Sequence, residues 1–163
     1  MSNASTKVDM HEVVGLASGE RLVGLDFRKN GMLYAVGSTS RLFSLAPSTA
    51  TATAISFDVN AKAVPRITAL AYAASGAGYA LDAHTGSLVR IADAYSGELQ
   101  TVGTMGLTAS DVGGFDIAGT DAFAALRVGS VTSLYAVDLA TGKVVSMGIL
   151  GDGGPVTGLA IQP

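Results

Sequence analysis

A short apolar phrase occurs four times in this sequence at an almost constant interval. It reads LVGLDF from Leu22, ITALAY from Ile67, VGGFDI from Val112 and VTGLAI from Val156. The central apolar residues of the four copies are separated by 45, 45 and 44 positions. A period of this length indicates a repeat architecture, in which each repeat is one supersecondary unit that packs on its neighbours.

Three further segments of each repeat keep nearly the same interval. The second segments contain Tyr34, Tyr79 and Ala124, which lie 45 residues apart, and the third contain Leu42, Leu88 and Leu134, which lie 46 apart. The fourth segments read TATAIS, ELQTVG and KVVSMG. In each segment β-branched and aromatic residues alternate with small or polar ones, which is typical of β-strands.

Turn residues occupy the joints between these segments. Asn30-Gly31 is a strong hairpin signal, and further glycines that can adopt positive φ occur at Ser75-Gly76, Thr85-Gly86, Ser96-Gly97 and Thr141-Gly142. No stretch keeps a 3.6-residue apolar period with helix caps, so we expect no helix. The sequence therefore predicts an all-β fold in which each repeat is a sheet of four antiparallel strands.

A repeat of about 45 residues with four strands has the dimensions of a β-propeller blade. The first strand of each repeat also carries a small residue, namely Gly24, Ala69, Gly114 and Gly158. Innermost blade strands crowd around a central axis, where a bulky side chain would clash. We therefore predict propeller-type blades, with an all-β sandwich as the alternative.

We expect one propeller-like domain over residues 8–163, after a polar tail at 1–7 that resembles a cloning remnant or a disordered end. The predicted blades cover about 22–60, 66–108 and 111–150, with an extra strand at each end, 9–15 and 156–161. The N-terminal DMHEVVG is similar to GKVVSMG at the end of the third blade, which predicts an outer strand.

Three blades with two end strands do not make a closed ring, because propellers usually have at least four blades. Three arrangements remain open. Two chains could join into one ring with the end strands sealing the seams, the chain could be a fragment of a longer propeller, or the end strands could form a thin fourth blade in a monomer. The first arrangement predicts a homodimer, and an open ring would expose apolar faces and strand edges.

Composition excludes several classes of function. Hydrophobic residues make up 48% of the 163 residues and charged residues 14%, and the net charge is −3 without any run of Lys or Arg. Nucleic acid is therefore not an expected partner. There is no cysteine, which excludes disulfides and thiolate chemistry. No apolar run reaches the ~18 residues of a membrane span, and the opening MSNASTK lacks the pattern of a signal peptide.

The segment Arg21–Ile55 resembles the opening of an uncharacterised family of bacterial propeller-like proteins. Phe57–Ile67, Gly113–Leu126, Leu134–Gly151 and the final VTGLAI are similar to later parts of the same family. The resemblance implies a propeller-like fold and export from the cytoplasm, because members often carry a leader peptide. It implies no activity or cofactor, and this chain is shorter than such proteins usually are.

Asp26 and Asp116 occupy the same position in two first strands, directly after the central apolar residue. Carboxylates on innermost strands could face the axial channel and hold a cation such as calcium. They could equally accept hydrogen bonds from the blade backbone, or pair with Arg28 and Arg127. These two aspartates are our candidate metal ligands.

A ligand is expected on the face that bears the loops before each first strand and between the second and third strands. Arg41, Arg66, His84 and Arg127 lie in these loops and are our candidate ligand-binding residues. The longest such loop is Asp58–Arg66. Glu20, Asp111 and Asp152 are expected on the same face, and this mixture of charges suits a small polar ligand or a protein partner.

No residue is marked as a nucleophile or a general base. The glycine-rich GDGGP and SGAGYALD lack the spacing of phosphate-binding loops and are predicted turns. We therefore expect a binding or scaffold module without catalysis and without a cofactor, which closes its ring by self-association. The alternative is a cation-dependent hydrolase or lyase with Asp26 and Asp116 near the ring axis.

Overall fold

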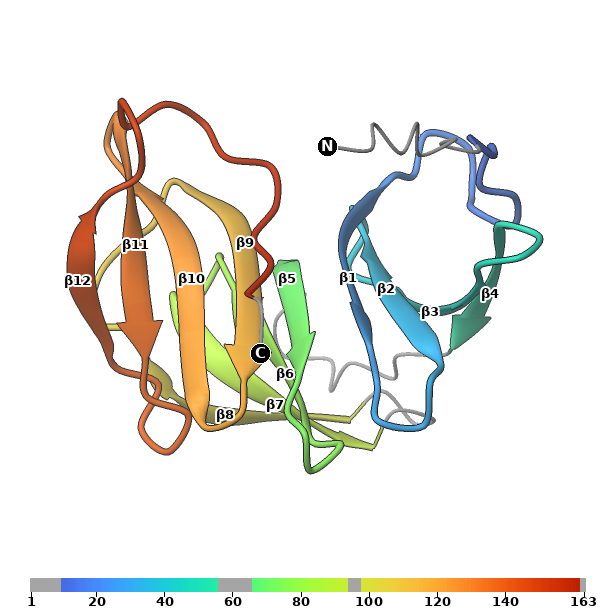
Figure 1. Cartoon of the computed structure of the whole chain (residues 1–163), viewed down its shortest axis with the longest axis horizontal. Helices are drawn as coiled ribbons and strands as arrows, with labels where there is room; N and C mark the ends of the chain where they lie inside the picture. Colours follow the sequence, from blue (N-terminus) through green and yellow to red (C-terminus); the bar gives the residue numbers. More distant parts are fainter. Residues whose placement is uncertain (1–9, 56–65, 94–97, 162–163) are drawn as a thin grey trace, which may run out of the picture.

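The computed structural model describes residues 10–55, 66–93 and 98–161, which form three four-stranded antiparallel sheets (Figure 1). The first sheet contains β1 (Leu22–Phe27), β2 (Leu33–Gly37), β3 (Leu42–Ala46) and β4 (Thr51–Ile55). The second contains β5 (Ile67–Tyr72), β6 (Gly78–Asp82), β7 (Ser87–Asp93) and β8 (Glu98–Thr104). The third contains β9 (Asp111–Ala118), β10 (Asp121–Val128), β11 (Val131–Val137) and β12 (Val144–Ile149).

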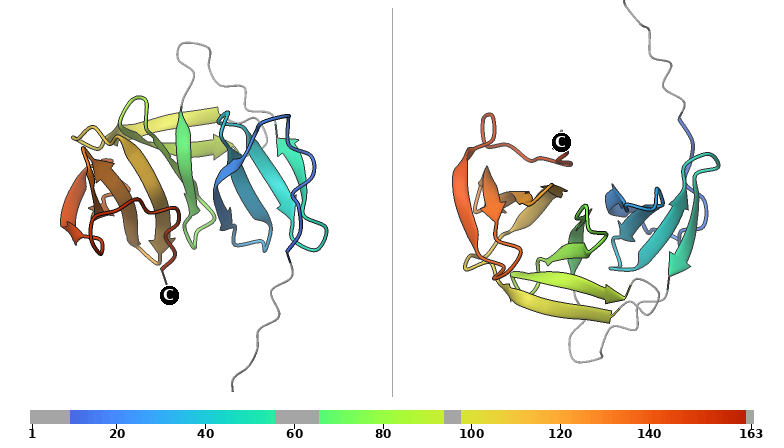
Figure 2. Two further views of the ribbon diagram at one scale, coloured as in Figure 1. Left: turned by 90° about the horizontal axis from the view of Figure 1, so that it is seen from above. Right: turned by 60° about the horizontal axis from the view of Figure 1, so that its bottom comes forward.

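Each sheet is one blade whose strands pair in the order of the sequence. The three blades stand side by side as an open arc, with β1, β5 and β9 on the inner side (Figure 2). We call the side of a blade that faces the next blade its forward face, and the opposite side its back face. The predicted all-β fold with three propeller-type blades is confirmed, and the arrangement in series differs from a two-layer sandwich. The described residues contain no helix, and hence none that could cross a membrane.

The local sequence explains why these strands form. Alternate residues of β9 are buried, among them Phe115 and Ile117, while the residues between them are only partly covered. The Asn30-Gly31 turn joins β1 to β2, with Gly31 at φ 77° and the Asn30 side chain accepting the Met32 N–H at 3.1 Å. Such a positive φ suits glycine and explains the hairpin signal.

Two apolar cores fill the seams between neighbouring blades. The core between blades 1 and 2 includes Tyr34, Val36, Leu42, Leu70 and Tyr72. The core between blades 2 and 3 includes Leu81, Leu88, Phe115, Ile117 and Leu126. Stability therefore comes from face-to-face contacts between successive repeats, as expected for a repeat architecture.

One sequence alignment between repeats is shifted by a residue. The spacing of 45 placed Ala124 at the position of Tyr34, but the pairing places Phe123 there. Tyr34 is opposite Asp26, and Phe123 is opposite Asp116. The cause is a shorter connection in blade 3, because four residues separate the paired Ile117 and Ala122, whereas five separate the equivalent pair Phe27 and Leu33. Phe123 therefore lies on the forward face of blade 3, and Ala124 lies on the back face.

The two ends of the described chain lie against the blades. Of the predicted outer strand 9–15, the described part forms a parallel bridge between Val14 and Thr51 of β4. The segment 156–161 runs along the forward face of β9, where a Cβ on Gly114 would lie 2.5 Å from the backbone N of Leu159. In the structure this end segment takes the place of a fourth inner strand.

Candidate functional site

The inner strands surround a cavity of about 540 Å³ on the axis of the arc. Its walls come from β1, β5, β9 and the segment 157–160, with Leu25, Leu70, Phe115 and Leu159 among the lining residues. The described residues that line it carry no charged side chain. The cavity therefore offers apolar and backbone surface to whatever enters it.

Asp26 joins β1 to the next blade through backbone hydrogen bonds. Its Oδ1 accepts the N–H of Phe27 at 2.7 Å, and its Oδ2 accepts the N–H of Tyr72 on β5 at 2.6 Å. Burial raises the pKa of the Asp26 carboxyl above its ordinary value, and the negative charge of Asp116 adds to that rise. The backbone hydrogen bonds act in the opposite direction but do not outweigh burial.

Asp116 repeats this arrangement at the far end of the arc. Its Oδ1 accepts the N–H of Ile117 at 2.8 Å, and its Oδ2 accepts the N–H of Ile161 at 2.6 Å. Asp26 and Asp116 thus each accept a backbone N–H from the next inner segment, which is the hydrogen-bonding role that we gave as an alternative to metal binding. Among the described residues no group of three or more His, Asp or Glu side chains is placed to hold a metal ion. A cation role for the two aspartates stays a prediction.

A buried tyrosine next to Asp26 lies beside the partly buried side chain of Arg28. The ring centroids of Tyr72 and Tyr34 are 5.3 Å apart, and the guanidinium carbon of Arg28 lies 5.8 Å from the centroid of the Tyr72 ring. Arg28 also donates through Nε to the carbonyl of Gly76 at 3.3 Å. The Tyr72 hydroxyl is buried and has no hydrogen-bond partner, and burial raises its pKa. The repeat pattern identified Tyr72 only as a packing residue and gave no signal for this polar environment.

Arg41, a candidate ligand-binding residue, is bound to a buried carboxylate. Its Nη2 lies 2.5 Å from Oε2 of Glu20, whose side chain is only 1% exposed. Thr39 donates its hydroxyl to the same carboxylate, and the Arg41 guanidinium lies over the Phe43 ring at 5.4 Å. The hydrogen bond from Arg41 lowers the pKa of Glu20. The repeat spacing carries no signal for this ion pair between Glu20 and Arg41.

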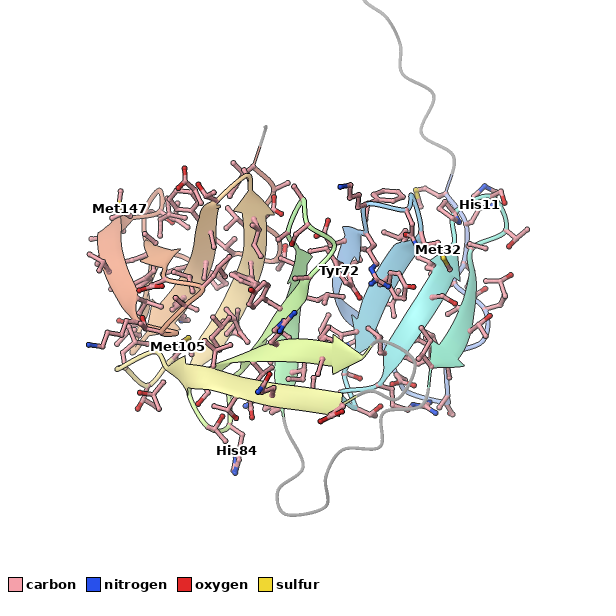
Figure 3. All side chains as sticks on the ribbon, turned by 90° about the horizontal axis from the view of Figure 1, so that it is seen from below. His11, Met32, Tyr72, His84, Met105 and Met147 are labelled. Carbon is pink, nitrogen blue, oxygen red and sulfur yellow. The ribbon has the colours of Figure 1, made fainter. Side chains whose placement is uncertain are left out.

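Arg66 and His84 are brought together by Asp82, which is 4% exposed. Oδ1 of Asp82 accepts the backbone N–H of Arg66 at 3.1 Å and that of His84 at 2.8 Å. Thr85 donates its hydroxyl to Oδ2 at 2.9 Å. The His84 side chain itself is exposed and points away from the blades (Figure 3). The preceding loop residues 58–65, part of the predicted ligand-binding loop, lie outside the described residues.

Arg127 lies on the third blade, apart from the other three candidates. It is opposite Asp111 on β9 and opposite Thr132 at the start of β11. Nη1 of Arg127 and the hydroxyl of Thr132 are both buried without a hydrogen-bond partner. Thr132 stands at the repeat position of Ser40, whose hydroxyl accepts the N–H of Ile67 at 3.0 Å. The hydroxyl at this repeat position therefore has a hydrogen-bond partner in blade 1 but none in blade 3.

The fold is similar to parts of several solved β structures. A virginiamycin B lyase from Staphylococcus aureus matches at a TM-score of 0.57 and 10% identity, over 81% of this chain and 42% of that one. A calcium-binding regucalcin from Agrobacterium tumefaciens matches at 0.59 and 15%, over 86% and 49%. A chain of a nidogen–laminin complex matches at 0.58 and 10%, over 78% and 48%. This chain thus spans less than half the length of each, and such low identities show the fold alone.

A family model covers nearly the whole chain. The model is described as a domain of unknown function (DUF4394), and it matches residues 1–57 and 56–160. No protein with curated annotation matches the sequence.

Proposed function

Because the chain belongs to the DUF4394 family of domains of unknown function, we propose its role from its geometry: a propeller-type binding module that closes its ring by associating with a second copy. The three four-stranded blades establish the propeller-like fold. The self-association and the ligand-binding face are the proposal, and the exposure of β1 is the observation that carries it.

The back face of β1 is exposed at positions that the other blades bury. Leu25 is 57% exposed, whereas Leu70 and Phe115 at the same repeat position are 2% and 5% exposed. Phe27 is likewise 58% exposed, whereas its equivalent Tyr72 is 6% exposed. In blades 2 and 3 the preceding blade covers these positions, whereas no blade precedes blade 1 among the described residues. The exposed side chains are therefore one half of a seam of the kind that already occurs twice in the chain.

The energetic reason for closing this seam is hydrophobic. Complete burial of a side chain such as Leu or Phe stabilises an assembly by roughly 1.5–3 kcal/mol before ordering costs. At the other end of the arc, Val145, Met147 and Ile149 of β12 are 66%, 60% and 65% exposed. Clusters of exposed apolar residues mark interaction surfaces. Both open ends of the arc thus favour association.

The ligand-binding face proposed for the closed ring carries Arg41, Arg66, His84 and Arg127. His84 and Arg66 are exposed beside the same buried carboxylate, and part of the Arg41 side chain, 44%, is also exposed. Cationic and imidazole groups at one end of the blades suit an anionic or polar ligand, or an acidic protein surface. A binding role without catalysis is supported by Asp26 and Asp116, whose carboxylate oxygens already accept backbone N–H groups.

The test is the molar mass in solution, measured by light scattering behind a sizing column over a range of concentrations. We expect twice the chain mass of 16.3 kDa. Leu25→Ser together with Phe27→Ser should return the protein to a monomer. Val128→Ser is the matched control, because Val128 is 41% exposed at the end of β10 and lies outside the inner strands. A wild-type monomer at every concentration would overturn self-association and favour closure within one chain or by a further part of a longer protein.

A further inference from the structure

The segment 156–161 takes the place of a fourth inner strand without forming a regular strand, and no strand follows it among the described residues. Gly158 holds the small position of the fourth phrase, as Gly24 and Gly114 do in the first and third. A Cβ on Gly24 would lie 3.2 Å from Cα of Ala69, and one on Gly114 would lie 2.5 Å from N of Leu159, because the next inner strand packs there. A Cβ on Gly158 would meet nothing within 4 Å. The forward side of Gly158 is therefore open where the other two are filled.

β1 is the matching inner strand, and in the part of the chain that the structure describes no strand precedes it. The glycine of one inner segment faces the central apolar residue of the next: a Cβ on Gly24 would lie 3.2 Å from N of Leu70, and one on Gly114 would lie 2.7 Å from Cβ of Leu159. The residue that would face Gly158 in a further seam is therefore at the position of Leu25, which is 57% exposed. Leu25 and the segment 157–160 line the same axial cavity, so within one chain the exposed Leu25 and the open side of Gly158 face a common space.

The outer part of blade 1 is covered although no blade precedes it. Phe27, Leu33, Leu45 and Ala52 are opposite one another across the four strands, and so share the back face. Phe27 is 58% exposed, but Leu33 and Ala52 are 7% and 4% exposed. The N-terminal segment lies on this outer edge, since Val14 accepts the N–H of Ala52 at 2.8 Å. Blade 1 is thus open on its inner part and covered on its outer part.

Blade 3 has the reverse distribution on its forward face. Asp116, Phe123, Ala136 and Val145 are opposite one another from β9 to β12. Asp116 is bonded to Ile161 of the end segment, whereas Val145 is 66% exposed. The inner part is covered and the outer part is open. The forward face of blade 3 and the back face of blade 1 are therefore complementary.

We propose that two copies associate with the forward face of blade 3 of one copy against the back face of blade 1 of the other, and that the two chain ends fill the space between these faces. Segment 156–161 of one copy fills the inner part of this space, with Gly158 against the partner's Leu25, and segment 10–15 of the partner covers the outer strand β12. The inference rests on the proposed self-association and specifies its contact. A two-fold axis would create two identical seams, as is usual for homodimers.

The experiment is a disulfide cross-link, in which no native thiol can compete because the chain contains no cysteine. The variant carries Leu25→Cys and Gly158→Cys. Disulfides need Cβ atoms about 3.5–4.5 Å apart, and in the filled seam a Cβ on Gly114 would lie even closer, 2.7 Å, to Cβ of Leu159. Both substitutions should fold, because Leu25 is exposed and Gly158 has open space. The protein is oxidised mildly and examined under denaturing conditions without reductant.

We expect most of the double variant to run as a covalent dimer that reductant returns to the monomer. Leu25→Cys alone and Gly158→Cys alone should stay monomeric under these conditions, because neither thiol meets its own copy at the seam. Light scattering of the reduced double variant separates the remaining outcomes. A native dimer that does not cross-link would overturn this contact and leave self-association standing. A monomer whose two thiols bond within one chain would overturn both, and would establish closure inside a single molecule.

Discussion

The two filled seams of this molecule are held together in different ways. Between blades 1 and 2, the N–H of Ile67 is bonded to the Ser40 hydroxyl and that of Tyr72 to the Asp26 carboxylate, both from the preceding blade. Between blades 2 and 3, the equivalent N–H groups of Val112 and Ile117 are bonded at 2.9 and 2.8 Å to aspartates of β9 itself. Polar side chains thus bridge the first seam at these two positions, whereas at the equivalent positions of the second seam the described N–H groups are bonded within blade 3.

The difference shows that the carboxylate at this repeat position is not required for blades to pack. Blade 2 has Ala71 where blades 1 and 3 have Asp26 and Asp116, and Ala71 is fully buried in an apolar core. A charged group there would lose hydration without an available N–H partner. Polar bridging and apolar packing are therefore alternative ways of joining the same repeat, and each can be weakened separately.

The largest effect should come from removing apolar volume at one repeat position in both seams. Leu42 and Leu88 are equivalent and are 1% and 0% exposed. Each substitution, Leu42→Ala or Leu88→Ala, should lower the free energy of unfolding by about 2–5 kcal/mol. We expect Leu88→Ala to cost more, because the described residues of the second seam show no equivalent of the Ser40 and Asp26 bridges. Denaturant unfolding followed by circular dichroism measures both, and a smaller loss for Leu88→Ala would contradict the comparison.

A smaller effect is expected for the polar bridge itself. Asp26→Ala leaves the partly buried Tyr72 N–H without its acceptor, which should cost about 1–3 kcal/mol. Asp121→Ala is the control, since Asp121 is exposed at the start of β10. The readout is again the free energy of unfolding. If Asp26→Ala were as stable as the control, the carboxylate would not contribute to the first seam.

Much of the fold followed from periodicity, because every blade repeats the same strand chemistry. The four phrases, the turn glycines and the small inner residues predicted the three sheets and their order. The exception is Ala124. Phe123 and Ala124 are both apolar, so counting residues cannot detect that the connection between β9 and β10 is one residue shorter than that between β1 and β2. Only pairing with Asp116 shows that Phe123 takes the position of Tyr34.

The candidate site was less predictable, because its contacts join residues that are far apart in the sequence. The spacing of 90 between Asp26 and Asp116 marked a shared role, but the acceptor function depends on the N–H of the next repeat, 46 and 45 residues away. The ion pair of Glu20 and Arg41 crosses from the chain before β1 to the turn before β3. Neither contact has a local sequence signal.

The smallest of the three effects is the pH dependence of the first seam. Burial raises the pKa of Asp26 above its unfolded value, so the folded protein binds this proton more tightly than the unfolded chain does. Stability contributed by Asp26 therefore falls as pH rises from the unfolded pKa through the folded pKa, and stays low above it. Glu20 and Asp138 have lowered pKa values and act in the opposite sense, since their contributions are lost as pH falls.

Comparison with Asp26→Asn separates the contribution of Asp26 from those of Glu20 and Asp138, because asparagine does not titrate. The unfolding free energy of the wild type relative to Asp26→Asn should rise as the pH is lowered from about 7 to about 4, near the ordinary range of an aspartate. Denaturant melts at several pH values give this difference directly. A difference that is constant over the range would mean that burial does not perturb Asp26 in the folded state. A difference that falls toward acid would mean that the hydrogen bond from Tyr72 outweighs burial, and the first seam would then depend on the charge of Asp26.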